Sequence, residues 1–360
     1  MHRRRFLGQV AGASAAIAST SFLAAGSISQ AAPVAAGPKA SVQYLTCDRR
    51  FIDARPCFDP TGTTVLFMRT PIDDQNQTWL YTIPAASARH VPHHCQPPDP
   101  FFVDPNLPAT RPDWSLTRTS FEIAFAGNGK LHLLNTNTRT SLFVNCQPSG
   151  GVVLDTLSYP SWTHDGSAIV LTNYSEQALE HQQLLRVPVP PNPSAPFSPV
   201  CTAVTDSSQV WPGMCSVSPV NPNLVAFAGQ APNLANVYDQ NWNQIWVQDS
   251  ANAPLEVDGI QGRAPWWSPT GTAIAYETIL TPDDLYNPFL RIWVLPLTVD
   301  PPAVGTGQLI TPPDLPVQHA KWSPDGTRIV FAYVIPGGPP TPTADVPPQG
   351  IAIVDLPSSI

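Results

Sequence analysis

The hydrophobic positions of this chain fall in short continuous runs, and several runs follow an aromatic residue and a tight turn. The clearest case is Ala320–Phe331, where Trp322 precedes a turn containing Pro324 and Gly326. Proline pre-sets φ and glycine accepts positive φ, so this stretch predicts a hairpin. The strand that follows, Arg328–Tyr333, is almost entirely apolar. Such a strand should be covered on both faces, as in sheets stacked face to face around an axis.

Five earlier stretches repeat the same order of anchor residue, turn and apolar strand. The aligned anchors are Phe58, Trp114, Trp162, Val217, Trp267 and Trp322. Their spacings of 56, 48, 55, 50 and 55 residues suit a four-stranded sheet with one or two long loops. The sequence therefore predicts an all-β fold for residues 41–360, a single six-bladed β-propeller of four-stranded antiparallel blades. Seven blades, with one copy too eroded to recognise, are the alternative.

The two ends of the repeat region predict how the ring closes. After Val354 only Asp355–Ile360 remain, too few for an outer strand and its turn. Ser41–Thr46 has strand character but no partner of its own. We expect this N-terminal strand to complete the last blade, which would remove an exposed sheet edge.

Composition supports strands and loops over helices. Proline accounts for 44 of 360 residues, about 12% against a usual ~5%, and helix interiors tolerate it poorly. Charged residues make up 12% of the chain, and the formal net charge is −8. A nucleic-acid partner is not expected, because phosphate binding requires a basic face.

The N-terminus, residues 1–31, has the pattern of an export signal. Arg3–Leu7 is followed by an apolar, alanine-rich stretch to Ala25, and Ser29–Ala31 offers a small-x-small cleavage site. The paired arginines before Phe-Leu resemble a twin-arginine signal; an ordinary leader or an uncleaved anchor is the alternative. A Pro/Ala linker at 32–40 follows. We expect a periplasmic or secreted bacterial protein without a transmembrane anchor after signal removal.

The order aromatic-Ser-Pro-Asp/Thr-Gly before an apolar strand resembles the WD40-like repeat of the TolB family of periplasmic proteins. The resemblance covers about residues 42–356 and is strongest at Trp267–Gly271 and Trp322–Gly326. TolB also has a small α/β domain before its propeller, for which 32–58 has no room, so this chain resembles the propeller alone. The resemblance implies a non-catalytic cell-envelope protein that binds a protein or peptide partner, which we expect to be a monomer.

Six cysteines in an exported chain suggest disulfides. They are Cys47, Cys57, Cys95, Cys146, Cys201 and Cys215. Two of them end outer strands, and two others lie in the innermost strands that follow. The repeat therefore predicts the bridges Cys47–Cys57 and Cys201–Cys215 and leaves the remaining two to pair with each other or stay free. Buried free thiols are the alternative for each pair.

One set of equivalent positions gathers charged and aromatic residues near the predicted axis. Three residues before each anchor lie Arg55, Arg111, Tyr159, Met214, Ala264 and His319, with Arg263 one step earlier in its strand. Innermost propeller strands start near the axis, so these side chains should ring one mouth of the channel. On an acidic protein they would suit an anionic group or a partner's acidic loop. Hydrogen bonding between blades is the alternative role.

Other candidate chemistry is weak. His90, His93, His94 and Cys95 form a small cluster, but adjacent histidines point in opposite directions in an extended chain, so a solvated loop is favoured over a metal site. No cofactor is expected. The chain has no Gly-x-Ser-x-Gly motif, as a propeller-bearing serine hydrolase would need. The enzyme alternative is a hydrolase or lyase acting on a saccharide or lactone in the channel mouth.

Overall fold

A computed structural model describes most of the chain after residue 40. The described ranges are 41–74, 76–92, 95–175, 182–230, 244–249, 254–278, 290–299, 302–336 and 347–357. The predicted signal at 1–31, the linker at 32–40 and the pair His93 and His94 lie outside them. In the part that the structure describes, the only helix is a 3-10 turn, η1 (Ala85–Ser87), and no helix could cross a bilayer.

The strands follow one another in a recurring order of inner, second, third and outer. The inner strands are β2 (Phe51–Phe58), β6 (Thr110–Trp114), β11 (Thr156–Trp162), β15 (Trp211–Val217), β19 (Arg263–Trp267) and β24 (Val317–Trp322). The second strands are β3 (Thr64–Pro71), β7 (Ile123–Gly127), β12 (Ala168–Tyr174), β16 (Leu224–Gln230), β20 (Ala273–Thr278) and β25 (Arg328–Val334). Each second strand pairs antiparallel with the inner strand before it.

The third and outer strands continue each sheet away from the axis. The third strands are β4 (Trp79–Pro84), β8 (Lys130–Leu134), β13 (Gln183–Pro188), β17 (Gln244–Asp249), β21 (Arg291–Val299) and β26 (Gln349–Asp355). The outer strands are β5 (Asp99–Phe102), β9 (Ser141–Phe143), β14 (Val200–Ala203), β18 (Leu255–Gln261), β22 (Pro302–Val304), β23 (Gln308–Leu309) and β1 (Val42–Tyr44). A short additional strand, β10 (Gln147–Pro148), pairs in parallel with β14.

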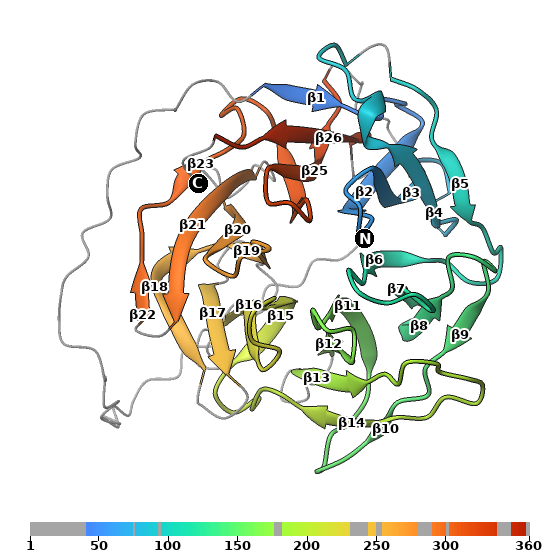
Figure 1. The fold of residues 1–360 in the computed structure, drawn as a ribbon, viewed down its shortest axis with the longest axis vertical. Coiled ribbons are helices and arrows are strands. Elements are labelled where there is room, and N and C mark those ends of the chain that lie inside the picture. Colours follow the sequence, from blue (N-terminus) through green and yellow to red (C-terminus); the bar gives the residue numbers. More distant parts are fainter. Residues whose placement is uncertain are drawn as a thin grey trace, which may run out of the picture. The chain divides into compact units, whose positions relative to one another are not determined.

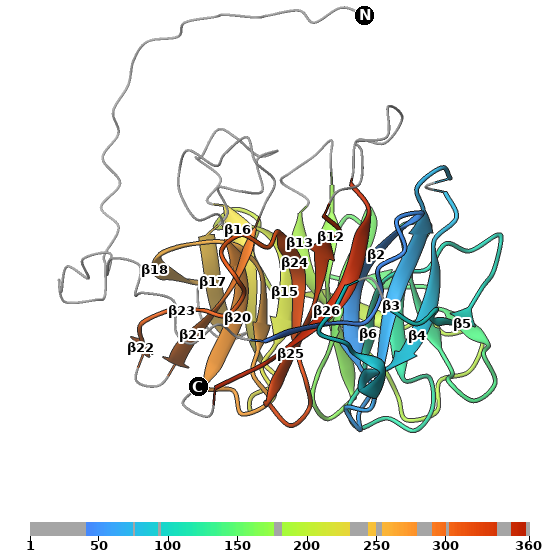
Figure 2. The same cartoon turned by 90° about the horizontal axis from the view of Figure 1, so that it is seen from above.

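The sheets stand around a common axis, and the fold is an all-β propeller. Figure 1 shows inner strands such as β2, β6, β11, β15 and β19 around the centre, with later strands progressively further out. Seen from the side in Figure 2, the strands run between the two faces of the ring. Among the described residues, hydrogen bonds join the strands into five sheets, of eight, five, four, five and four strands.

Burial explains why the apolar runs form second strands. Every residue of β7 and of β16 is buried, which confirms that these runs are covered on both faces. The hairpin predicted around Gly326 is also confirmed. Gly326 has φ +72°, and its N–H donates to the carbonyl of Ser323 at 3.0 Å. The core therefore lies between neighbouring sheets.

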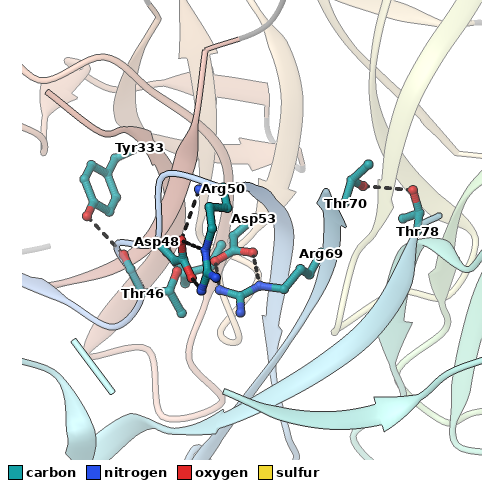
Figure 3. A network of polar contacts seen from close by, with 9 residues as sticks. Thr46, Asp48, Arg50, Asp53, Arg69, Thr70, Thr78 and Tyr333 are labelled. Carbon is teal, nitrogen blue, oxygen red and sulfur yellow. Dashed lines mark hydrogen bonds and ion pairs between the residues drawn. The ribbon is translucent and has the colours of Figure 1, made fainter. Parts of the chain in front are cut away.

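The first and last strands of the chain share one sheet. β1 pairs antiparallel with β26, with Val42 opposite Val354, as the strand count predicts. Just after β1, Thr46 is fully buried; its carbonyl accepts from the Tyr333 hydroxyl at 3.0 Å, and its hydroxyl accepts from the N–H of Ile351 at 2.8 Å. Figure 3 shows the contact between Tyr333 and Thr46 and, nearby on β2 and β3, the ion pair of Asp53 and Arg69.

The cysteine pairing that the repeat predicts is wrong. The disulfides are Cys47–Cys95 and Cys146–Cys201, with Cα–Cα distances of 5.9 and 5.8 Å, and the other two cysteines, Cys57 and Cys215, are buried and free. An outer strand lies roughly three strand spacings, or about 14 Å, further from the axis than an inner one. A disulfide spans only about 4.4–6.8 Å between Cα atoms. The bridges therefore join peripheral segments, and the inner-strand thiols are left in the core.

Candidate binding site on the propeller axis

Each inner strand contains an irregularity shortly before its anchor. The register shifts fall at Ala54/Cys57, Thr110/Asp113, Ser158/Ser161, Pro212/Cys215, Arg263/Trp266 and Gln318/Lys321. Such a bulge inserts one extra residue and re-aims the side chains around it. Because the bulge recurs at nearly the same height in each inner strand, the six bulges lie at one level along the propeller axis.

The bulges place non-glycine residues in left-handed backbone. The residues and their φ values are Arg55 (55°), Arg111 (54°), Tyr159 (52°), Ala264 (48°) and His319 (62°). This is a conformation that glycine adopts freely and that costs another residue about 1–2 kcal/mol. Because Ala264 shares this conformation, the left-handed backbone belongs to the recurring bulge and not to one kind of side chain. Met214, at the sixth position, keeps negative φ, and the bulge in its strand begins one residue earlier.

All six predicted positions, Arg55, Arg111, Tyr159, Met214, Ala264 and His319, line one cavity of about 50 Å³, which we call the axial cavity. Its volume has room for a few water molecules. The remaining wall is largely apolar and includes Pro112, Pro160, Pro265 and Trp266. The fold thus brings together the side chains at the aligned positions, which lie up to 264 residues apart in the sequence (319 − 55). Arg263 is not part of the lining.

Two arginines contact one aromatic ring in the axial cavity. The guanidinium carbon of Arg55 lies 4.9 Å from the centre of the Tyr159 ring, and that of Arg111 lies 4.4 Å from it. Arg55 also contacts the Met214 sulfur through Nη1, at 3.4 Å. Within the described ranges, neither arginine has a carboxylate at salt-bridge distance. Burial alone would raise the pKa of Tyr159, but the charges of Arg55 and Arg111 outweigh it, and the pKa is lowered.

The third arginine has a structural role. Arg263 Nε donates to Glu277 Oε2 at 3.1 Å, and its Nη2 donates to Gln318 Oε1 at 3.0 Å. The other carboxylate oxygen of Glu277 accepts from the backbone N–H of His319. Glu277 is fully buried. These bonds connect β19 and β20 to β24, so for Arg263 the structure agrees with the alternative role, hydrogen bonding between neighbouring sheets.

The electrostatic environment of the axial cavity is strongly positive. Burial, reinforced by Arg111, lowers the pKa of the Arg55 guanidinium to about 10, while Tyr159 opposes the shift. Burial, followed by Arg55 and Arg263, lowers the pKa of His319 well below its usual value. His319 is therefore neutral at pH 7, and its Nδ1 has no hydrogen-bond partner among the described residues.

A second ring of residues, which the sequence interpretation missed, lies one position before each anchor. These residues are Cys57, Asp113, Ser161, Ser216, Trp266 and Lys321, and all line a neighbouring cavity of about 90 Å³. Lys321 and Trp266 line both cavities. The Lys321 ammonium donates to Asp113 Oδ1 at 2.9 Å and lies 4.0 Å from the centre of the Trp266 ring. The same repeat alignment, read two positions later, would have found this ring.

These features define the class of protein: an all-β propeller with a positively charged cavity on its axis. No family model matches the chain, and no similar curated protein was found. Solved structures resemble it. A putative TolB from Agrobacterium tumefaciens is 15% identical, with 72% of this chain and 81% of that one covered and a TM-score of 0.51. A protein of unknown function from Dyadobacter fermentans is 13% identical, with 89% and 99% covered and a TM-score of 0.56.

TolB from Acinetobacter baumannii is also similar, at 12% identity, with 88% of this chain and 64% of that one covered and a TM-score of 0.47. At identities of 12–15% the likeness shows the β-propeller fold alone. The two disulfides add a separate indication, since such bonds persist in oxidising, exported locations.

Proposed function

We propose that this chain is a non-catalytic binding protein of the bacterial cell envelope, a six-bladed propeller that recognises a protein or peptide partner at its axis. The observation that carries the proposal is the axial cavity, where Arg55 and Arg111 lack carboxylate partners among the described residues. Both residues are half-buried, and a partly desolvated charge is stabilised by a partner of opposite sign, so this arrangement favours an external anion.

The blade count is part of the proposal. The eight-stranded sheet is joined between β2 and β26 by the single parallel pair Ile52 and Gln349. Dividing the sheet there gives one unit of β2–β5 and another of β24–β26 with β1. With the other four sheets this supports six units, each with its own inner-strand bulge. Export by a twin-arginine signal at 1–31 and a monomeric state complete the proposal.

A saccharide hydrolase is less well supported. Such enzymes use two carboxyl groups that face each other across the substrate. Among the described residues lining the two cavities, Asp113 is the only carboxylate. Its oxygens already accept from Lys321 Nζ and from the N–H of Trp162, at 2.9 and 2.7 Å. Turnover of a saccharide or lactone that is abolished by Arg111→Gln or His319→Asn would favour the enzyme.

The binding proposal is tested by comparing three forms of the full chain as bait for envelope proteins. These are the wild type, the double variant Arg55→Gln/Arg111→Gln and the control Arg50→Gln. Arg50 is a matched control because its side chain is 82% exposed and pairs only locally with Asp48. We expect quantitative mass spectrometry to find a protein retained by the wild type and the control and lost by the double variant. No retained protein, or equal retention by all three forms, would refute the proposal.

A further inference from the structure

We propose that the axial cavity binds a carboxylate, held by the guanidinium groups of Arg55 and Arg111, both of which lie next to the Tyr159 ring. This deepens the function proposed above and rests on it for the source of the carboxylate, which is either a partner's C-terminus or an acidic side chain. Three properties of the cavity favour a carboxylate: its charges, its hydrogen-bond donors and its size.

Among the described residues, two arginines at the cavity have no carboxylate at salt-bridge distance, although Arg111 hydrogen-bonds to Tyr159 and Arg55 contacts the Met214 sulfur. Of the four cationic side chains at this level, Arg263 is paired with Glu277 and Lys321 with Asp113. Arg55 and Arg111 remain, and each contacts the Tyr159 ring. Loss of solvent around the half-buried Arg55 guanidinium lowers its pKa to about 10. An anion between the two groups would stabilise both.

The available donors favour a carboxylate over phosphate. Tetrahedral oxyanions are commonly bound by several converging backbone N–H groups. Here the residues after the left-handed positions in four strands are Pro56, Pro112, Pro160 and Pro265, which have no N–H, and the last three line the cavity. The forked guanidinium donors suit either anion, so the shortage of backbone N–H groups is the feature that favours a carboxylate.

The size of the cavity sets a second limit. About 50 Å³ accommodates a few water molecules, so a carboxylate with a short carbon stem fits and a sugar ring does not. The apolar part of the wall, including Trp266 and the buried Met214, suits the methylene groups next to a carboxylate. The left-handed backbone at both arginines is consistent with this role, because glycine would be less strained there but could supply no guanidinium.

The test uses ¹³C-labelled acetate as the smallest probe, at constant ionic strength, with binding followed by NMR line broadening on the full chain. We expect saturable binding in about the millimolar range, as befits a ligand of four heavy atoms. Arg55→Gln and Arg111→Gln should each weaken it about tenfold or more, because each removes one charge-assisted contact. Arg50→Gln should leave it unchanged. Arg111→Lys, which keeps the charge but loses the fork, should weaken it less than Arg111→Gln.

Further arms identify the source of the carboxylate and exclude alternatives. Short peptides with a free C-terminus are compared with C-terminally amidated peptides that carry an internal glutamate, and phosphate serves as the competing anion. The absence of saturable acetate binding, unchanged binding in both glutamine variants, or phosphate binding more tightly than acetate would each overturn the proposal. Acetate binding without any retained envelope protein would support the carboxylate site while refuting the partner. A retained partner without acetate binding would support the binding function while refuting the carboxylate site.

Discussion

Gly350→Ala should break the contact by which the two ends of the chain meet. A Cβ at residue 350 would lie 2.2 Å from the carbonyl oxygen of Thr46 and 2.7 Å from the Tyr333 ring. The N-terminal segment would have to move outward by about 1 Å to reach ordinary contact distance. Four hydrogen bonds depend on its position: Leu45 and Thr46 both donate to the Ile351 carbonyl, Ile351 donates to the Thr46 hydroxyl, and Tyr333 donates to the Thr46 carbonyl.

At about 1 kcal/mol each, loss of most of these bonds should lower the free energy of unfolding by about 3 kcal/mol. This also falls within the range of about 1–3 kcal/mol for overpacking a core. The measurement is guanidinium chloride unfolding followed by tryptophan fluorescence. Gly307→Ala is the matched control, because its added Cβ would meet nothing closer than 3.5 Å and stability should change by less than about 0.5 kcal/mol. Equal stability of the two variants would refute the reasoning.

Three further predictions concern the disulfides, a histidine and the strained backbone. Replacing Cys47 and Cys95 with serine removes their bridge and should lower the free energy of unfolding by about 4 kcal/mol on the loop-entropy model. Thiol titration of the unreduced, denatured wild type should find two free thiols, and a count of zero would contradict the pairing. Because the folded-state pKa of His319 is lowered, the unfolded state takes up the proton first, so stability should fall as pH drops below about 6.5, by at most about 1.4 kcal/mol per pH unit. His319→Asn should flatten this slope; an unchanged slope would exclude His319 as its source. Ala264→Gly should leave the free energy of unfolding unchanged or raise it by up to about 1 kcal/mol, because glycine adopts the left-handed backbone freely. Ala273→Gly, in a regular strand, should lower the free energy of unfolding by about 1 kcal/mol. Equal losses in the two variants would contradict the left-handed assignment of Ala264.

Much of the fold could be predicted because its strands and turns are indicated by residues that are close together in the sequence. Aromatic anchors, Pro-x-Gly turns and continuous apolar runs each report a strand or hairpin from a few adjacent residues. The pairing of β1 with β26 also followed, from counting strands at the two ends. The disulfides could not be predicted in this way. Whether Cys47 reaches Cys57 or Cys95 depends on the radial width of a sheet, and the repeat alignment contains no information about that width.

The site was predicted in part for the same reason. The repeat placed Arg55 and Arg111 at equivalent positions, and the structure brings them into one cavity. It did not reveal their left-handed backbone, because arginine before proline carries none of the glycine signal of such a bulge. The contact of Lys321 with Asp113 was also missed, since it joins residues 208 positions apart and depends on how the inner strands converge.

The pairing of the first strand with the last has a consequence for synthesis. β1 (Val42–Tyr44) is synthesised long before its partner β26 (Gln349–Asp355). Until β26 has been made, β1 therefore has no edge to join, and a chain that stops before β26 leaves the backbone of β1 unpaired. Such products should be preferred targets of chaperones and proteases, so a single late stop codon should remove this protein from the cell more completely than most internal substitutions.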